Sequence, residues 1–175
     1  TDPERLARFV AAIRGQATRA AQLINELLDV SRLESGRAAL RRAPVDLAAL
    51  VQAAAERERD VLPDDDRHSI AVEVAGNGPR RIEGDEARLD QVITNLLSNA
   101  VKYSPAGGVV RVLVEQAPDE VCIRVVDQGI GIAAAERDQL FAPFSRTSAA
   151  RQSGVEGTGL GLYISRRIVE AHGGT

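Results

Sequence analysis

Two asparagines, a lysine and a tyrosine recur at helical spacing in the segment DEARLDQVITNLLSNAVKYSP. They are Asn95, Asn99, Lys102 and Tyr103, at positions i, i+4, i+7 and i+8, which share one face of a helix. Amide oxygens suit a hard cation, and Lys102, the chain's only lysine, suits a phosphate. A solvated helix face is the simpler interpretation, but two asparagines in an apolar run are poor helix formers that need a reason.

A second signal lies at the end of an expected strand, in the stretch VVDQGIGI. Asp127 is followed by Gly129 and Gly131, so its carboxylate can accept a hydrogen bond from an exocyclic amine while the backbone approaches a flat ring. For this stretch alone, a plain Asp-Gly turn is the simpler interpretation.

The glycines of GTGLGL, at Gly157, Gly159 and Gly161, fit neither common phosphate loop. A dinucleotide fingerprint follows a strand in a parallel βαβ unit, whereas a polar loop precedes these glycines. A Walker A loop requires a lysine directly after the glycines, and this chain has none there. What remains is a backbone that can approach phosphate, followed by a helix N-terminus; a flexible hinge is the alternative.

The stretch LFAPFSR contains two of the three phenylalanines, Phe141 and Phe144, with Arg146 directly beyond. These rings can cover a ligand, anchor a loop or pack in the core, and their spacing alone does not choose among these roles.

Composition excludes several classes of protein. The 175 residues are 44% hydrophobic and carry a net charge of −3, so bulk electrostatics favour neither nucleic acid nor an anionic membrane as partner. No apolar run approaches the roughly 20 residues of a membrane helix, and no signal peptide opens the chain. Cys122 is the only cysteine, which excludes an internal disulfide; its alternating surroundings predict a buried strand thiol.

A long helix is expected over residues 4–35. Its apolar residues follow a 4-3 repeat typical of a helical bundle: Leu6, Val10, Ile13, Ala17, Ala20, Ile24 and Leu27. A lone helix cannot bury such a stripe, so we expect it to pack against another chain or against sequence outside this segment. Packing against the chain's own second domain is the alternative.

The remainder predicts an α+β domain. Asp46 is the expected N-cap of a helix to about residue 59, and Asp85 caps a helix over 86–103 whose apolar face includes Leu89, Ile93 and Leu96. Further expected elements are strands at 69–75, 81–83, 108–116 and 120–128, a short helix at 134–141, a polar loop at 145–158 and a helix at 159–171. Strands adjacent in sequence predict hairpins in a mixed or antiparallel sheet with helices on one face.

In this order and spacing, the asparagine helix, DQGIGI, LFAPFSR and GTGLGL closely resemble the N, G1, F and G2 boxes of bacterial two-component sensor histidine kinases, members of the GHKL superfamily. The stretch LINELLDVSRLESGRAALRRAPVDL is similar to that family's second dimerisation helix and its link to the ATP-binding domain. The resemblance implies a Bergerat-type α/β sandwich, a mixed sheet under helices, over 41–175, ending before its last strand. Residues 1–40 would be the second helix of a dimerisation domain.

The resemblance also implies a role for each box residue. Asn99 would be the Mg²⁺ ligand, and Asn95 would support the metal and phosphate region. Lys102 and Arg146 would contact phosphates, Tyr103 would flank the nucleotide, and Asp127 would bind the adenine amino group. The glycine boxes would line the adenine pocket with Gly129 and Gly131, and would close over the phosphates with Gly157, Thr158, Gly159, Leu160 and Gly161. Residues 145–157 would form a mobile ATP lid.

The implied activity is that of a protein-histidine kinase with ATP and Mg²⁺ as cofactors. The γ-phosphoryl group would pass to a histidine on the dimerisation helix and then to an aspartate of a response regulator receiver domain. The implied partners are a second copy, joined through the helix at 4–35, and that receiver domain, without nucleic acid or direct membrane contact by this segment. We expect the segment in the cytoplasm, where ATP is found, whether or not the parent protein is anchored in a membrane.

Neither histidine matches the family's phosphoacceptor sequence, so no catalytic residue is assigned in this chain. His68 is expected to be an exposed residue at a strand start, and His172 a partly charged cap of the last helix. The acceptor is therefore expected upstream of Thr1.

Two other functions remain open at this point. GHKL ATPases of the gyrase, chaperone and mismatch-repair type place a glutamate base where Asn95 stands, and an amide cannot take a proton from water. Asn95 thus favours phosphoryl transfer over hydrolysis. A non-catalytic, nucleotide-sensing dimerisation module is the second alternative, because the acceptor histidine is not found here.

Overall fold

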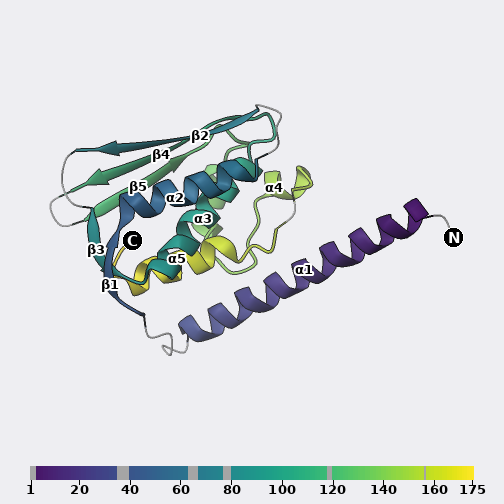
Figure 1. Cartoon of the computed structure of the whole chain (residues 1–175), viewed down its shortest axis with the longest axis horizontal. Coiled ribbons are helices and arrows are strands. Elements are labelled where there is room, and N and C mark those ends of the chain that lie inside the picture. The colour runs from purple at the N-terminus through teal and green to yellow at the C-terminus, as the bar shows by residue number, and fades with distance from the viewer. Residues whose placement is uncertain (1–2, 35–39, 63–66, 77–79, 118–119, 156) are drawn as a thin grey trace. The chain divides into compact units, whose positions relative to one another are not determined.

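The computed structural model describes residues 3–34, 40–62, 67–76, 80–117, 120–155 and 157–175. The chain divides into two compact units, Thr1–Ala38 and Ala39–Thr175 (Figure 1). The first contains one helix, α1 (Pro3–Glu34), which matches the helix expected over 4–35. None of the described helices is both long and apolar enough to cross a membrane.

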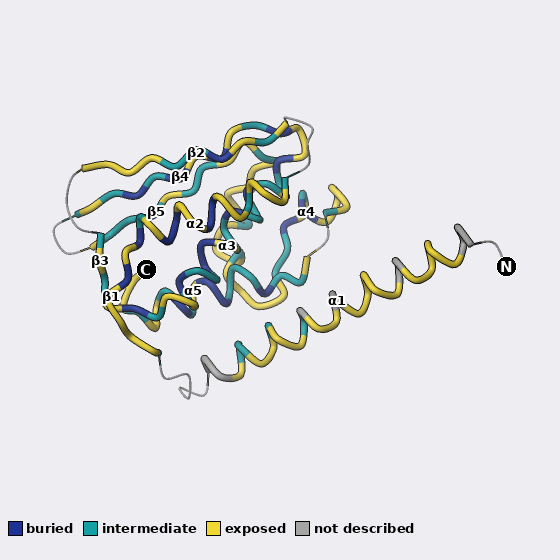
Figure 2. The backbone as a smooth tube through the Cα atoms, in the orientation of Figure 1, coloured by how far each residue is buried: buried dark blue, intermediate teal, exposed yellow. Residues whose placement is uncertain are grey.

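Helix α1 presents its apolar residues to solvent, as its yellow tube in Figure 2 shows. Ile13 is 68% exposed and Ile24 58% exposed, well above the exposure of a buried side chain. The other large apolar residues exposed on α1 are Leu6, Phe9, Val10, Leu27 and Leu28. The helix thus carries exposed apolar residues along its length.

The second unit contains two small sheets. Strands β2 (His68–Ala75), β4 (Gly108–Gln116) and β5 (Val121–Val126) form one sheet, in which β2 pairs with β4 in parallel and β4 pairs with β5 antiparallel. Strands β1 (Ala43–Asp46) and β3 (Arg81–Gly84) form the other, antiparallel, sheet. The mixed sheet and the β4–β5 hairpin confirm the α+β prediction.

The expected hairpin between the strands at 69–75 and 81–83 is wrong. Strand β3 pairs with β1, where Val45 lies opposite Ile82, and β2 pairs with the more distant β4. The sequence did not predict β1, because four residues that include a proline carry no readable alternation.

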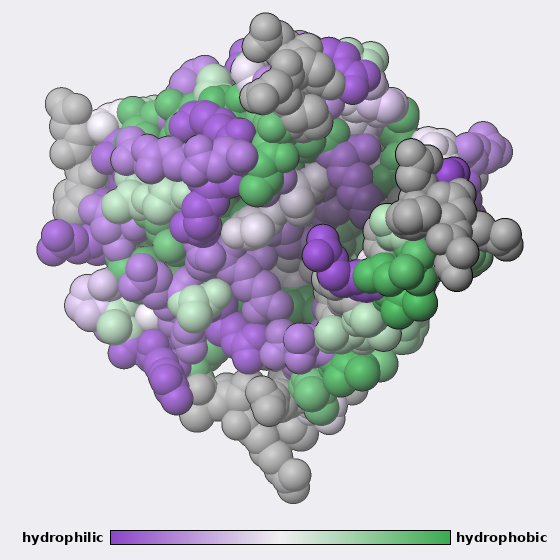
Figure 3. Space-filling view, turned by 45° about the vertical axis from the view of Figure 1, so that its right-hand side comes forward, coloured by the Kyte–Doolittle hydropathy of each residue, from purple (hydrophilic) through white to green (hydrophobic). Residues whose placement is uncertain are grey.

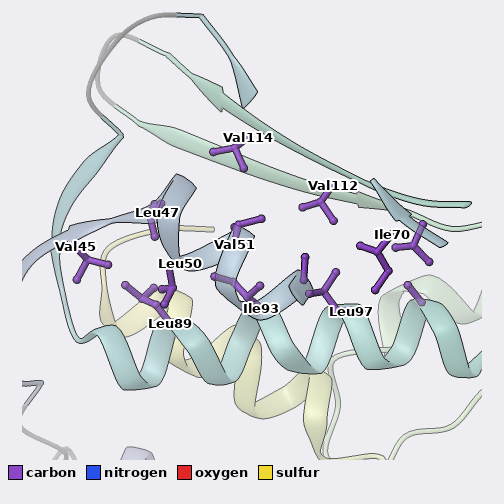
Figure 4. Close-up of a cluster of buried hydrophobic side chains, with 14 residues drawn as sticks. Val45, Leu47, Leu50, Val51, Ile70, Leu89, Ile93, Leu97, Val112 and Val114 are labelled. Atoms are coloured by element: carbon purple, nitrogen blue, oxygen red, sulfur yellow. The ribbon is translucent and has the colours of Figure 1, made fainter. Parts of the chain in front are cut away.

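Helices α2 (Leu47–Asp60) and α3 (Glu86–Lys102) cover one face of the three-stranded sheet (Figure 1). Figure 4 shows the core between them, where side chains from both helices meet valines from β4. Its fully buried members include Val51, Leu97 and Val112. Leu97, rather than the expected Leu96, faces this core, because the buried face of α3 follows Leu89, Val92, Ile93, Leu97 and Ala100.

The two predicted helix caps are confirmed. The carboxylate of Asp46 accepts hydrogen bonds from the N–H groups of Ala48 and Ala49, and that of Asp85 accepts one from Arg88. Both acidic side chains therefore satisfy N–H groups that a helix start leaves without partners.

The C-terminal third differs in detail from expectation. The short helix is a 3₁₀ helix, η1 (Ala134–Gln139), and the polar loop contains a helical turn, α4 (Ser148–Gln152). The Thr147 hydroxyl accepts a hydrogen bond from Ala150 N–H, which caps α4. The last helix, α5 (Gly161–Ala171), starts two residues later than expected and packs against α3.

His172, at the C-cap of α5, connects the C-terminal end of α5 to the N-terminal end of α3. Its Nε2 accepts a hydrogen bond from Asp85 N–H at 2.9 Å. The ring proton therefore sits on Nδ1, which donates a hydrogen bond to Ile168 O at 2.7 Å. The capping position agrees with expectation, but the expected positive charge does not, because a protonated Nε2 could not accept a hydrogen bond. The chain that follows the first unit joins the same junction, since Arg41 N–H donates to Asp85 Oδ2 and Arg42 Nη2 donates to Ala171 O.

We expect Asp85→Ala to lower the free energy of unfolding by about 1–2 kcal/mol, the usual cost of losing an N-cap. The hydrogen bond from Arg41 N–H is the main cause that lowers the pKa of Asp85, with a smaller contribution from Arg88 N–H. The stabilisation is complete above the unfolded-state pKa of about 3.9 and is lost as pH falls through the lower folded-state pKa. Urea denaturation at pH 7 and pH 3 measures both effects. Equal stability of wild type and variant at pH 7 would contradict the assignment.

Candidate nucleotide-binding site

The polar face of α3 meets α5 through Asn95. Asn95 Nδ2 donates a hydrogen bond to Ser165 Oγ at 2.9 Å, and Asn95 Oδ1 accepts one from Asn99 Nδ2 at 3.4 Å. Both asparagines are half-buried, and Ser165 is buried. The face that the sequence predicted as polar is therefore an ordered chain of amide and hydroxyl groups.

A glycine allows the two helices to approach this closely. A Cβ atom added at Gly161 would lie 2.3 Å from Asn95 Oδ1 and 3.0 Å from its Cγ. Contacts under 3.0 Å do not occur without displacement, so any larger residue at this position must move Asn95 or α5. The last glycine of GTGLGL thus sets the distance between α5 and the asparagines of α3.

The glycine-rich loop also passes beside the C-terminal end of α3. A Cβ atom added at Gly157 would lie 3.2 Å from Lys102 Nζ and 3.6 Å from Tyr103 Oη. The Lys102 ammonium lies 5.7 Å from the centre of the Tyr103 ring. Segments more than 50 residues apart in sequence thus bring a cation, a phenol and an exposed glycine backbone to one place.

The acidic residue after β5 is linked to the same end of α3. Asp127 is exposed and its Oδ1 accepts a hydrogen bond from Gly129 N–H at 2.9 Å, which orients the carboxylate. Ile130 N–H donates to Tyr103 O at 2.9 Å, so the loop after β5 is bonded directly to the end of α3. Gly131 follows with a φ of 68° and is exposed.

The rest of the glycine-rich loop is anchored at one end. The Thr158 hydroxyl accepts a hydrogen bond from Leu160 N–H at 3.2 Å, and the Leu160 side chain is fully buried. Gly159 has a φ of 74°, and a Cβ atom added there would lie 2.7 Å from backbone atoms of both Phe144 and Ser145. The loop is thus fixed at Leu160 and exposed at Gly157.

Arg146 binds backbone oxygens rather than standing free beside the site. Its Nη2 donates to Ala150 O at 2.9 Å and also to Val155 O. Nε of this guanidinium is buried without a partner among the residues that the structure describes. Arg146 therefore holds the segment around α4 together in this structure, a role that its sequence position did not predict.

The two phenylalanines are not core residues. Phe141 is 40% exposed, with the Arg166 guanidinium 5.8 Å from its ring centre, and Phe144 is 62% exposed with a φ of 61°. A positive φ in an aromatic residue is uncommon and marks a constrained loop. Figure 3 shows apolar side chains on one face of the molecule as separate patches among hydrophilic ones.

Two side chains outside the site also differ from expectation. His68 is half-buried, with Nε2 2.8 Å from Ser104 O, rather than exposed at the strand start. The thiol of Cys122 is half-buried rather than buried.

The donor atoms of the asparagine pair fit a hard cation. The hydrogen bond between Asn99 Nδ2 and Asn95 leaves the Asn99 amide oxygen as the ligand atom of the pair. No group of three or more histidine, cysteine, aspartate or glutamate residues forms a metal site in the described part of the chain. Mg²⁺ is commonly held by one or two protein oxygens together with substrate phosphates, and this arrangement fits that chemistry.

Residues 84–175, just over half of the chain, match the family of histidine kinase-, DNA gyrase B- and HSP90-like ATPases. The chain belongs to this family. It is 39% identical over 176 residues to the probable sensor histidine kinase TcrY of Mycobacterium tuberculosis, covering 99% of this chain and 36% of TcrY. It is 35% identical to the sensor-like histidine kinase SenX3 of Mycolicibacterium smegmatis, covering 99% of this chain and 44% of SenX3.

Solved structures of histidine kinases share the fold. The mycobacterial sensor histidine kinase MprB aligns with a TM-score of 0.63 at 33% identity, over 75% of this chain and 80% of that one. Full-length ShkA, solved in complex with AMPPNP, aligns with a TM-score of 0.79 at 30% identity, over 95% of this chain and 34% of that one. The histidine kinase ATPase fold and the sensor histidine kinase family expected from the boxes are confirmed, and the chain spans less than half of the curated relatives TcrY and SenX3.

Sequence reasoning missed Ser165 altogether. It stands in the apolar run GLYISRRIVEA, four residues after Gly161, so it lies on the same face of α5 as the glycine that contacts Asn95. A small polar residue at that spacing was the available signal.

Gly161→Ala is expected to lower the free energy of unfolding by about 1–3 kcal/mol, because the added methyl group overpacks against Asn95. Gly157→Ala is the matched control. Its added methyl group meets the end of the flexible Lys102 side chain, so the expected change is within about 0.5 kcal/mol. Urea denaturation without nucleotide makes the comparison; equal effects of the two substitutions would show that α3 and α5 do not depend on this contact.

Proposed function

We propose that this chain is the ATP-binding catalytic core of a sensor histidine kinase, which binds Mg-ATP and donates the γ-phosphoryl group to a histidine on a dimerisation helix. Residues 41–175 are the catalytic domain, and residues 1–40 are the second helix of the dimerisation domain. The phosphoryl group then passes to an aspartate of a response regulator. The complex of ShkA with AMPPNP, an ATP analogue, supports ATP as the ligand.

The observation that carries this proposal is the meeting of three distant segments along the C-terminal half of α3. The loop at Gly157 lies against Lys102, the start of α5 lies against Asn95, and the loop after β5 is bonded to Tyr103. The place fits a nucleoside triphosphate, because it offers a cation, amide oxygens, backbone N–H groups at a helix start and an oriented carboxylate.

Each group has a proposed part in binding. Asp127 accepts the adenine amino group, Gly129 and Gly131 line the adenine pocket, and Tyr103 flanks the nucleotide. Lys102 and the backbone of Gly157–Gly161 bind the phosphates, and Arg146 contributes a guanidinium whose buried Nε has no hydrogen-bond partner within the described ranges. Asn99 supplies the amide oxygen to Mg²⁺. That cation would supply positive charge against the negative charge of the phosphoryl group.

Asn95 favours transfer over hydrolysis in this arrangement. A GHKL ATPase requires a carboxylate base for water at this position, and an amide has no basic atom. Both polar groups of the Asn95 side chain are hydrogen-bonded, the NH₂ group to Ser165 and the oxygen to Asn99. The groups that surround the phosphates would therefore stabilise the transferred charge without activating water.

The first unit fits a dimerisation helix. Its apolar residues are exposed along α1, and a second copy of the chain would bury them in a helical bundle. The receiver domain of a response regulator is the proposed recipient of the phosphoryl group.

Asp127→Asn is expected to lower ATP affinity at least about tenfold, equivalent to about 1.4 kcal/mol. Gly129 N–H would hold the asparagine oxygen in place, so the new NH₂ group would face the adenine amino group as a second donor. The same NH₂ suits the guanine carbonyl oxygen, so the preference for ATP over GTP should also fall.

Calorimetric titration of both nucleotides in the presence of Mg²⁺ tests this, with Asp60→Asn as a matched exposed substitution at the end of α2. Unchanged ATP affinity in Asp127→Asn would remove Asp127 from the adenine pocket.

Incubation with γ-labelled ATP and a separately supplied dimerisation domain that contains the acceptor histidine should transfer label to that domain. The label should be acid-labile, as expected for phosphohistidine. Release of labelled phosphate without transfer would support the ATPase alternative instead. Nucleotide binding with neither transfer nor release would support the nucleotide-sensing module.

A further inference from the structure

Ser165 is a buried polar residue that contacts a proposed site residue from another helix. Its side chain lies on α5 and is 6% exposed, and its hydroxyl oxygen accepts the hydrogen bond from Asn95 Nδ2 at 2.9 Å. The other buried hydroxyl residues that the structure describes, Ser104 and Thr147, form hydrogen bonds with residues three or four positions away. Ser104 Oγ donates to Ala100 O, and Thr147 caps α4.

In the contact with Ser165, the Asn95 amide points its NH₂ group toward α5. A carboxamide has one oxygen, which only accepts, and one NH₂ group, which only donates. Because the NH₂ group of Asn95 is bound to Ser165, its oxygen faces Asn99 and accepts the Asn99 NH₂. The Asn99 amide is thereby oriented in turn, with its own oxygen left for another partner.

Gly161 supports the same orientation from the other side. It lies one helical turn before Ser165 on α5, and a Cβ atom added there would lie 2.3 Å from Asn95 Oδ1. One face of α5 therefore contacts the Asn95 amide twice, closely at Gly161 and by a hydrogen bond at Ser165.

We propose that Ser165 is a positioning residue for metal-assisted nucleotide binding, which orients Asn95 and, through Asn95, directs Asn99 Oδ1 toward the cation. This inference rests on the proposed function of the site. Without the hydroxyl group, the Asn95 NH₂ loses its partner and gains by turning toward Asn99. It would then donate to Asn99 Oδ1, the atom that the cation requires.

Ser165→Ala is therefore expected to raise the Mg²⁺ concentration that half-saturates ATP binding roughly tenfold, the low end of the effect of residues that orient metal ligands. ATP binding in EDTA should not change, because Ser165 touches neither phosphate nor base in this assignment. Isothermal titration of ATP across a series of Mg²⁺ concentrations separates the two quantities.

Ser98→Ala is the matched control. The Ser98 hydroxyl donates a hydrogen bond to the backbone oxygen of Asn95 at 3.2 Å. It does not contact the side-chain amide of Asn95 in this hydrogen bond. This variant should keep the Mg²⁺ dependence of the wild type. Wild-type Mg²⁺ dependence in Ser165→Ala, or an equal loss of affinity with and without Mg²⁺, would overturn the inference. If the unmodified chain binds no ATP at all, the proposed function fails, which is a different result.

Side-chain NMR of the metal-free protein provides a second readout. The Asn95 NH₂ protons should exchange slowly and show a nuclear Overhauser contact with the Ser165 β-protons. In Ser165→Ala, the NH₂ signals of both Asn95 and Asn99 should shift, whereas Ser98→Ala should leave them in place. Rapid exchange of the Asn95 NH₂ protons in wild type, without that contact, would overturn the inference even if the variant failed to fold.

A double-mutant cycle separates action through Asn95 from a general effect on α5. In an Asn95→Ala background, Ser165→Ala should change the Mg²⁺ dependence by less than about twofold, because the group it orients is gone. A tenfold effect that persists there would show that Ser165 acts on the site by another route.

Discussion

The approach of α5 to α3 is the constraint on which the site depends. Asn95 and Gly161 are in contact, and that contact requires a residue without a side chain at the start of α5. The glycine-rich loop ends where α5 begins, so this packing also sets where the loop runs relative to Lys102. A helix–helix contact thus brings the glycine-rich backbone to the polar face of α3.

The same two helices are joined again at their other ends. The His172 ring accepts the Asp85 N–H at the start of α3 and donates to the last turn of α5, so each helix helps to satisfy the other's terminus. Arg41 and Arg42 bond to this junction and tie the chain that follows the first unit to it. Helix α3 is therefore held by the core on one face, by Gly161 near the site and by His172 at its start, which leaves little freedom in the placement of Asn95.

Local chemistry explains which features the sequence could predict. The caps at Asp46 and Asp85 depend on N–H groups two or three residues away, so both were predicted correctly. Strand β1 pairs with residues about 40 positions away and has no periodicity of its own, so it was missed. The box residues indicate the chemistry of the site, but the contact between Ser165 and Asn95 spans 70 residues, and the spacing of Ser165 on its own helix does not identify Asn95 as its partner.

The Asn95 amide also affects the competition between phosphoryl transfer and ATP hydrolysis at the proposed site. A phosphotransferase must stabilise charge on the γ-phosphoryl group while leaving water inactive until the acceptor arrives, because hydrolysis competes with transfer. An amide at this place has no basic atom, and its NH₂ group and oxygen are both engaged, by Ser165 and by Asn99. In the proposed site, the hydrogen bonds of Asn95 orient the Asn99 amide, whereas the lack of a general base follows from Asn95 being an amide. Selection between transfer and hydrolysis then depends on the nucleophile that reaches the γ-phosphoryl group, which must be an acceptor side chain basic enough to attack without help from Asn95.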